Sequence, residues 1–333
     1  MAANIEVIKG RILLPDGTLY TVDEAQANSA PITPEAASAT PADAPDADVV
    51  EISEAEPADE ERGPNHKAVI VAINQYEGCP LNGCINDGTQ DHDEAVNNYG
   101  FDGTFVRGLF DSRATTLAIW ERLKWLVQDA KPGDILFFAY SGHGAQATCR
   151  DECGEVDGLH EVICPVDFDW TPEHMITDKQ FVALFSTLPK GVKLFWISDS
   201  CHSGDLDRAI TIKTPNNPKI KIPKSFAVPA DVAWALAAAK KAGHKPTALR
   251  QFIEKYDVAF VPGCKSNQTS TDTSVEGRPC GALHYAFWDA VHRLGKNATV
   301  KAITDYARTT LANDGYDQEP IANGSLIDGP WLR

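Results

Sequence analysis

The stretch KLFWISDSCHSGD, from Lys193 to Asp205, decides how the rest of this chain is interpreted. It opens with the apolar run Leu194 to Ile197, which is typical of a buried β-strand because β-branched and aromatic residues end at small polar ones. Cys201 stands four residues after the end of this run. Open α/β sheets carry their functional side chains at the carboxyl ends of the strands. The stretch therefore predicts a reactive thiol at the edge of a sheet.

A second stretch has the same design. The apolar run DILFFAY, from Asp134 to Tyr140, is followed directly by Ser141, Gly142 and His143. If the two predicted strands are parallel neighbours, the imidazole and the thiol emerge at the same edge of the sheet. That placement is what a Cys–His nucleophile pair requires.

Predicted strands alternate with predicted helices along most of the chain, which favours a mainly parallel sheet with helices on both faces. An α/β fold is therefore expected. Ser112 is predicted to cap the helix expected over 113–130, and residues 145–160 are predicted to be a polar loop. The expected strands, besides the two above, are 67–74, 101–110, 161–166, 257–261 and 318–322, and the expected helices are 86–99, 113–130, 178–188, 231–241, 281–293 and 299–312.

Charge divides the chain into two regions. The net charge of the 333 residues is −17, and residues 1–66 hold 14 acidic and 3 basic residues. Repeated Ala, Pro, Asp and Glu in residues 23–64 predict that an N-terminal extension, 1–64, is largely disordered. The compact domain is expected over 65–333. The acidic balance argues against nucleic acid as a partner, because phosphate binding needs concentrated positive charge.

Compartment is inferred from the cysteines and from the apolar segments. No run approaches the roughly 18 apolar residues of a membrane helix, and the first residues lack a signal-peptide pattern. The eight cysteines lie in a long chain without a disulfide-rich composition. Free thiols in a reducing cytoplasm, with no membrane partner, are therefore expected.

The chemistry expected of the Cys–His pair is acyl transfer. A free thiol has a pKa of about 8.5, and a neighbouring imidazole can take its proton and later give it to a leaving amine. The oxyanion that forms needs two N–H donors. The small residues beside His143 leave the backbone approachable, so we assign this oxyanion hole to the N–H groups of Gly144 and Cys201.

The two motifs YSGHGAQ (140–146) and DSCHSGD (199–205) resemble the catalytic motifs of the metacaspases, members of the caspase-like cysteine peptidase clan. Further blocks resemble the same family in the same order: GCINDG (83–88), DGLHEVICPVDF (157–168), GCKSNQTSTDT (263–273) and GALHYAFWDAV (281–291). The resemblance covers about residues 65–325. It implies a caspase-like fold, His143 as general base and Cys201 as nucleophile.

The resemblance also implies a specificity pocket made by Cys84, Asp87, Ser141 and Asp199. Two carboxylates in a small pocket favour a guanidinium or ammonium group. The expected substrates are therefore proteins and peptides cut after Arg or Lys. The plainer alternatives are that Asp87 and Asp199 serve as turn or helix-cap residues, or that the peptidase prefers another residue.

The resemblance implies calcium as a possible cofactor, although the Cys–His chemistry itself requires no cofactor. The candidate ligands are Asp157 and Asp178, with Asp205 or Asp207 as additions, since hard oxygen ligands suit this ion. Family members commonly carry two adjacent acidic residues where this chain has Asp178 followed by a lysine. That lysine removes a ligand and adds a repulsive charge.

A Lys-rich insert, 206–250, separates the larger and smaller halves of the resemblance. An enzyme that cuts after Lys or Arg can cut this loop in itself, so an autocatalytically processed zymogen is one hypothesis and an uncut surface loop is the other. The resemblance favours a monomer. The alternative function is a non-proteolytic caspase-like interaction protein with the acidic extension as its docking arm. The candidate self-cleavage sites in residues 206–230 are Arg208, Lys213, Lys219, Lys221 and Lys224.

Overall fold

The computed structural model describes residues 65–148, 159–201, 221–226, 228–242, 248–265 and 268–333, together with three short strands near the N-terminus. The chain divides into two compact units, Met1–Gly63 and Pro64–Arg333. In the first unit, β1 (Val7–Ile8), β2 (Arg11–Leu13) and β3 (Leu19–Thr21) form an antiparallel sheet. The predicted linker, 23–64, lies outside the described residues.

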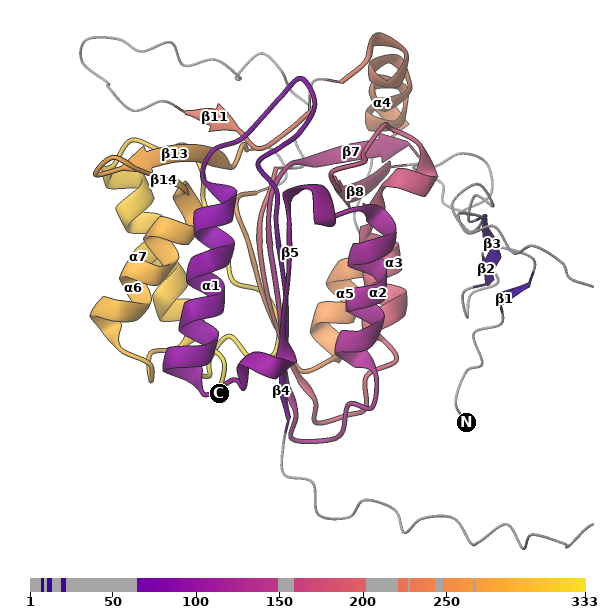
Figure 1. Cartoon of the computed structure of the whole chain (residues 1–333). Coiled ribbons are helices and arrows are strands. Elements are labelled where there is room, and N and C mark those ends of the chain that lie inside the picture. The colour runs from indigo at the N-terminus through magenta and orange to yellow at the C-terminus, as the bar shows by residue number, and fades with distance from the viewer. Residues whose placement is uncertain are drawn as a thin grey trace, which may run out of the picture. The chain divides into compact units, whose positions relative to one another are not determined.

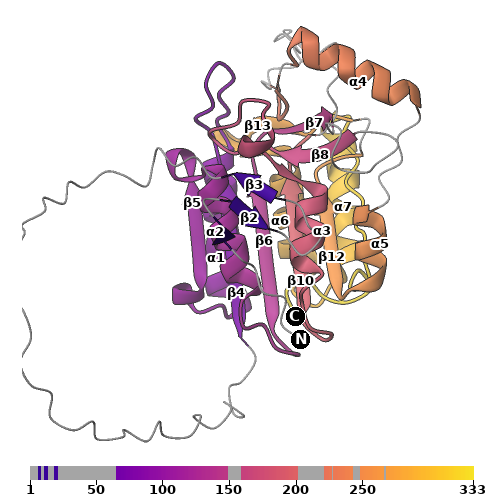
Figure 2. The ribbon, with the colours of Figure 1, turned by 90° about the vertical axis from the view of Figure 1, so that its right-hand side faces the viewer.

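The second unit is built on a five-stranded parallel sheet with the strand order β12-β10-β6-β4-β5 (Figures 1 and 2). The apolar runs 194–197 and 134–140 lie in the neighbouring strands β10 and β6. This confirms the α/β fold with a mainly parallel central sheet. The strands are β4 (His66–Ala72), β5 (Val106–Phe110), β6 (Ile135–Ser141), β10 (Lys193–Asp199) and β12 (Val258–Pro262).

Helices cover both faces of this sheet, with α1, α6 and α7 on one side and α2, α3 and α5 on the other (Figure 1). Successive strand residues point to opposite faces, so Phe137 and Phe195 belong to one buried cluster while Phe138 and Trp196 belong to the other. Both clusters are needed because each face of a parallel sheet must be buried. The helices are α1 (Cys84–Tyr99), α2 (Thr116–Val127), α3 (Asp178–Phe185), α5 (Ala248–Lys255), α6 (Ala282–Leu294) and α7 (Val300–Asn313).

Two small sheets lie at the carboxyl end of the central strands (Figure 1). One has the order β7-β8-β9 and the other β11-β13-β14, and all their pairings are antiparallel. A further helix, α4 (Ala230–Ala242), follows β11. The strands are β7 (Gly144–Thr148), β8 (Leu159–Ile163), β9 (Ile176–Thr177), β11 (Ile222–Pro223), β13 (Thr271–Val275) and β14 (Arg278–Gly281).

Three expectations about local structure were wrong. The helix expected over 113–130 begins at Thr116, and its N-cap is Thr115, whose side chain accepts from the Ala118 N–H, rather than Ser112. Residues 145–148 of the expected polar loop belong to β7, because this part of the chain pairs with β8. Residues 318–322 form no strand, and the chain there makes a single bridge, between Phe260 and Asn323.

No helix in the described part of the chain combines the length and apolarity needed to span a membrane.

Candidate active site

The register of the central sheet brings the two sequence motifs together. Ser141, the last residue of β6, pairs with Asp199, the last residue of β10. The residues that follow are linked as well, since the Gly142 N–H donates to the Asp199 carbonyl at 3.4 Å. His143 and Cys201 therefore leave the same edge of the sheet, and both are buried, with exposed fractions of 1% and 0%.

The His143 imidazole is oriented by a backbone carbonyl. Its Nε2 lies 2.7 Å from the Cys79 carbonyl oxygen, which can only accept, so Nε2 carries the hydrogen. The His143 backbone N–H donates to the Tyr76 hydroxyl at 3.1 Å. The other ring nitrogen, Nδ1, is buried and makes no hydrogen bond. Nδ1 is therefore the ring nitrogen of His143 that can accept a proton.

Burial keeps this imidazole neutral. Desolvation lowers the pKa of His143 to about 4, and the backbone carbonyls of Cys79 and Lys224 offset only part of that effect. A group with this pKa is unprotonated throughout the neutral range. The Nδ1 lone pair is thus available at pH 7 to take a proton from a thiol.

The N–H groups of Gly144 and Cys201 converge on one oxygen atom. The Gly144 N–H donates to the Lys224 carbonyl at 3.0 Å, and the Cys201 N–H donates to the same oxygen at 3.2 Å. The Cys201 thiol donates to the Gln268 carbonyl at 3.1 Å. A peptide carbonyl of this chain therefore lies between the two N–H groups expected to form an oxyanion hole, one of which belongs to Cys201.

The segment that supplies this carbonyl, residues 221–226, lies against β13 as an added strand. Ile222 pairs with Asp272 and Pro223 with Thr271 in antiparallel register. The ladder continues where the Lys224 N–H donates to the Ser270 carbonyl at 3.0 Å. Binding an extended segment at a sheet edge through main-chain hydrogen bonds is a recurring way of holding a peptide.

The Lys224 side chain fills the pocket beneath this segment. Its ammonium lies 2.8 Å from Asp199 Oδ2, 2.9 Å from Ser141 Oγ and 3.3 Å from Asp87 Oδ2, and the residue is 0% exposed. Burial opposes both charges, but their mutual attraction dominates. It holds the pKa of Asp199 below its usual range and that of Lys224 above its own. The pocket therefore accepts a cation deep inside the protein.

Neighbouring groups hold the two carboxylates in place. The Gly281 N–H donates to Asp87 Oδ1 at 2.9 Å, the Ser141 hydroxyl donates to Asp87 Oδ2 at 2.7 Å, and the Ser270 hydroxyl donates to Asp199 Oδ1. Three of the four carboxylate oxygens thus have a donor besides the ammonium, and His284 Nδ1 lies 3.3 Å from the fourth, Asp199 Oδ2. A buried charge pair with its remaining lone pairs satisfied is the arrangement that offsets the cost of desolvation.

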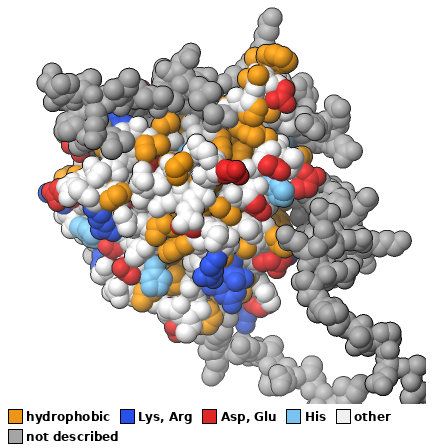
Figure 3. Space-filling view, turned by 45° about the horizontal axis from the view of Figure 1, so that its top comes forward, with side chains coloured by type: hydrophobic (Ala, Val, Ile, Leu, Met, Phe, Trp, Pro, Cys, Tyr) orange, Lys and Arg blue, Asp and Glu red, His pale blue; other side chains and the backbone are white. Residues whose placement is uncertain are grey.

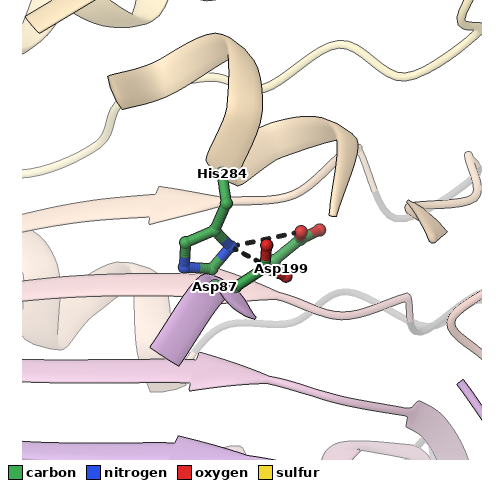
Figure 4. Close-up of side chains that lie close together, drawn as sticks. All are labelled: Asp87, Asp199 and His284. Atoms are coloured by element: carbon green, nitrogen blue, oxygen red, sulfur yellow. Dashed lines mark hydrogen bonds and ion pairs between the residues drawn. The ribbon is translucent and has the colours of Figure 1, made fainter. Parts of the chain in front are cut away.

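His284 closes the far side of the pocket. Its Nδ1 lies 3.3 Å from Asp199 Oδ2 and its Nε2 2.9 Å from Asp91 Oδ2, and Figure 4 shows the ring turned toward Asp87 and Asp199. Burial favours the neutral ring, but Asp91 and Asp87 together raise the pKa of His284 to about 10. His284 is therefore an imidazolium at neutral pH.

Asp87, Asp199 and His284 are also the one group of three potential metal ligands in the described part of the chain. The Lys224 ammonium contacts both carboxylates, and the protonated ring has no lone pair to give. The donor set therefore suits an amine or guanidinium rather than a metal ion.

The raised pKa of His284 gives a prediction about stability. A folded pKa of about 10, against about 6.5 in the unfolded chain, means that the stabilisation is complete below pH 6.5 and is lost as pH rises toward 10. We expect urea denaturation to show that, between pH 7 and 10, the free energy of unfolding falls by a few kcal/mol (order of magnitude) more in wild type than in His284→Gln. The exposed His92→Gln is the control and should follow wild type. Parallel pH curves for wild type and His284→Gln would rule the charged ring out.

The described residues include most of the side chains expected at the site. Asp87, Ser141 and Asp199 surround the Lys224 ammonium, and Cys84 is buried beside Ser141. The cap alternative for Asp87 does not apply to the start of α1, because the Asp272 carboxylate accepts the Asn82 and Gly83 N–H groups there.

Other expected residues lie elsewhere or outside the description. Asp178 Oδ1 lies 3.4 Å from His160 Nδ1, and both are almost buried. Lys221 is at the surface, with its ammonium 4.5 Å from the centre of the Tyr316 ring. The remaining candidates for calcium binding and self-cleavage lie outside the described residues: Asp157, Asp205, Asp207, Arg208, Lys213 and Lys219.

Sequence reasoning missed three contributors to the site: His284, Gly281 and the Cys79 carbonyl. His284 and Gly281 stand in the block GALHYAFWDAV, which was used only as a resemblance. A histidine between apolar residues on a predicted helix face was the available signal for His284. The role of a backbone carbonyl such as that of Cys79 leaves no mark on residue type.

Known proteins resemble this chain over most of its length. Residues 66–208 match the family described as metacaspase, peptidase C14 domain. Metacaspase-1 of Schizosaccharomyces pombe is 36% identical over 255 residues, which cover 68% of this chain and 59% of that protein. Metacaspase-1A of Aspergillus oryzae is 32% identical over 299 residues, which cover 80% of this chain and 70% of that protein. This chain thus spans less than two thirds of the S. pombe protein.

A solved structure supports the fold independently. The crystal structure of a protein from Geobacter sulfurreducens superposes with a TM-score of 0.58 at 21% identity, covering 81% of this chain and 98% of that one. At this identity the likeness concerns the fold alone. Two sequence motifs on neighbouring strands, a shared α/β fold and the match to relatives at 32–36% identity agree: the chain belongs to the metacaspase family of cysteine peptidases.

Proposed function

We propose that this chain is an endopeptidase that cleaves after Lys or Arg, with Cys201 as nucleophile and His143 as the residue that moves the proton. The observation that carries the proposal is the position of Lys224. Its ammonium lies 2.8 Å from Asp199, while its carbonyl accepts both the Gly144 and Cys201 N–H groups. One residue therefore satisfies the pocket and the oxyanion hole at the same time.

The proposed reaction follows from these contacts. His143 Nδ1 takes the thiol proton, and the Cys201 sulfur bonds to the carbonyl carbon, placing negative charge on the oxygen held by two N–H groups. The C–N bond then breaks, and Nδ1 gives the proton to the leaving amine. Water hydrolyses the resulting thioester by the same route, which regenerates the thiol and releases a carboxylic acid.

The charges of the pocket support the preference for basic residues. Two carboxylates, Asp87 and Asp199, face the bound ammonium, and Ser141 supplies a third oxygen. An acidic side chain in the same place would leave like charges buried together, which costs several kcal/mol (order of magnitude). Hydrogen-bond acceptors on several sides also suit the planar fork of Arg.

Self-processing is part of the proposal, and Lys224 is its site. Of the five candidates, Lys221 and Lys224 lie in the described residues, and it is the Lys224 carbonyl that accepts the N–H groups of Gly144 and Cys201, whereas the Lys221 ammonium lies over the Tyr316 ring. The bond to be cut is Lys224–Ser225. While the segment 221–226 stays in place, it blocks the site to other substrates. The uncut chain is therefore an inactive zymogen.

The function is tested with fluorogenic peptides that end in Arg, Lys, Asp or Asn at the cleaved bond. We expect release after Arg and Lys, and at least a hundredfold less after Asp or Asn, as a lost buried charge pair implies. Each peptide is assayed with calcium and with chelator, because calcium binding through Asp157 and Asp178 is still an untested prediction. Release after Asp equal to that after Lys, or no release under any condition, would refute the proposal.

Gly281→Ala should fill the pocket without straining the backbone. The added Cβ would lie 2.0 Å from Asp199 Oδ2 and 2.7 Å from Asp87 Oδ2, while the backbone of Gly281 (φ −72°, ψ 138°) suits any residue. We expect kcat/KM for Lys peptides to fall about a hundredfold, because ångström-scale displacement at a site has this effect. Gly103→Ala, with nothing within 4 Å, is the matched control. Full activity of Gly281→Ala would place the pocket elsewhere.

A further inference from the structure

The segment that occupies the site continues past the bond proposed to be cut, and its next contacts are aromatic. Ser225 forms a bridge with Gly144, and Phe226 follows. The Phe226 ring centre lies 4.8 Å from that of His143, 5.0 Å from that of Phe168 and 5.3 Å from that of Tyr76. Phe226 is half-buried and thus lies against three rings on the leaving-group side of the site.

The rings around Phe226 are held by contacts of their own. The Tyr76 hydroxyl donates to the Cys164 carbonyl at 2.9 Å and accepts the His143 N–H at 3.1 Å. Phe168 packs against Trp170 with ring centres 5.0 Å apart. His143 is fixed through Nε2 on the Cys79 carbonyl. A site whose walls are positioned independently of its occupant needs little ordering when a ligand binds.

The ring geometry favours an aromatic occupant over an aliphatic one. Phe226 meets Tyr76 edge to face, at an interplanar angle of 89°, and meets Phe168 and His143 at tilted angles of 40° and 55°. Edge-to-face and tilted pairs with centres 4.5–7 Å apart are the attractive arrangements of aromatic rings. Figure 3, in which the top of Figure 1 comes toward the viewer, shows hydrophobic, acidic and basic side chains interspersed on the described surface.

We propose that Tyr76, Phe168 and the face of His143 form a subsite for an aromatic residue placed second after the cleaved bond, so that preferred substrates read Lys or Arg, any small residue, then Phe, Tyr or Trp. This inference rests on the proposed function, because it takes Lys224 as the residue before the cut. The aromatic residue also covers the imidazole whose burial keeps Nδ1 unprotonated. It holds the leaving nitrogen of Ser225, or of a substrate, close to the group that protonates it.

The inference is tested by competition between two peptides in one reaction with the full-length chain. One peptide copies residues 222–228, Ile-Pro-Lys-Ser-Phe-Ala-Val, and the other carries Ala in place of Phe. The ratio of their consumption rates, followed by mass spectrometry, gives the ratio of kcat/KM and does not depend on the fraction of active enzyme. We expect the Phe peptide to be consumed on the order of tenfold faster.

Two variants connect the preference to the subsite. Phe168→Ala should bring the ratio close to one, whereas Phe105→Ala, which removes a partly exposed aromatic ring outside the site, should leave it unchanged. Equal consumption of the two peptides by wild type would overturn the subsite and leave the proposed function standing. Failure to cut either peptide, together with failure to cut a Lys peptide that carries only a fluorophore after the bond, would overturn the proposed function and the subsite with it.

Discussion

Cys201→Ala is expected to abolish cleavage of Lys and Arg peptides and cleavage of the chain itself. The remaining groups, Gly144 N–H and the His143 imidazole, can polarise a carbonyl but cannot form the thioester. Removing the nucleophile of a catalytic group that acts as a unit costs on the order of a thousandfold or more in rate. The measurement is kcat/KM on a fluorogenic Lys peptide, with the intact mass of the protein followed in parallel.

Cys264→Ala is the matched control for this variant. The Cys264 thiol donates to the Gln268 carbonyl at 3.3 Å, and the Cys201 thiol donates to the same oxygen at 3.1 Å. The two thiols therefore share an environment, while only one has its backbone N–H on the Lys224 carbonyl. We expect Cys264→Ala to retain cleavage. Activity that survives in Cys201→Ala and disappears in Cys264→Ala would show that Cys264, and not Cys201, is the nucleophile.

Asp199→Asn is expected to reduce kcat/KM for Lys peptides by a factor on the order of 10² to 10³. The change keeps the shape of the side chain and removes the charge closest to the bound ammonium, at 2.8 Å. Breaking a buried pair by removing one partner costs about 3–5 kcal/mol, which corresponds to this range at about 1.4 kcal/mol for each tenfold. The measurement compares Lys peptides with otherwise identical peptides that carry Gln at the cleaved position.

The same substitution should destabilise the uncut chain, because Lys224 then remains buried with less compensation. Lys224→Met in the Asp199→Asn background removes the unpaired ammonium and should recover most of the lost free energy of unfolding. Asp169→Asn, at an exposed ion pair with His174, controls for the loss of one surface charge and should change little. If Asp199→Asn cut Lys peptides as well as wild type, the pocket would have to lie elsewhere.

The fold and the pair of motifs could be predicted because both depend on short, continuous stretches of sequence. Apolar runs of strand length, each ending in small polar residues, predicted β6 and β10, and the parallel register then brings Ser141 beside Asp199. Helix ends were less predictable: Ser112 and Thr115 are both acceptable caps in sequence, and the Thr116 N–H at the start of α2 is held by Asp167, which lies 51 positions away.

The rest of the site depends on contacts between distant parts of the chain. Asp87 meets the Gly281 N–H across 194 positions, and Lys224 meets Ser141 across 83. In sequence, five basic residues of the insert are equivalent candidates for self-cleavage. Lys224 differs from Lys221 because β13 fixes the register of the segment, a property that no local pattern carries.

The most direct test of this account is mass spectrometry of the purified full-length chain over time, with the new termini identified. We expect wild type to yield a fragment that ends at Lys224 and a fragment that begins at Ser225. The Cys201→Ala variant should yield neither fragment. A chain that stays intact while it cleaves Lys peptides, or one that is cut only at another residue, would contradict the claim that Lys224 lies in the site as its substrate.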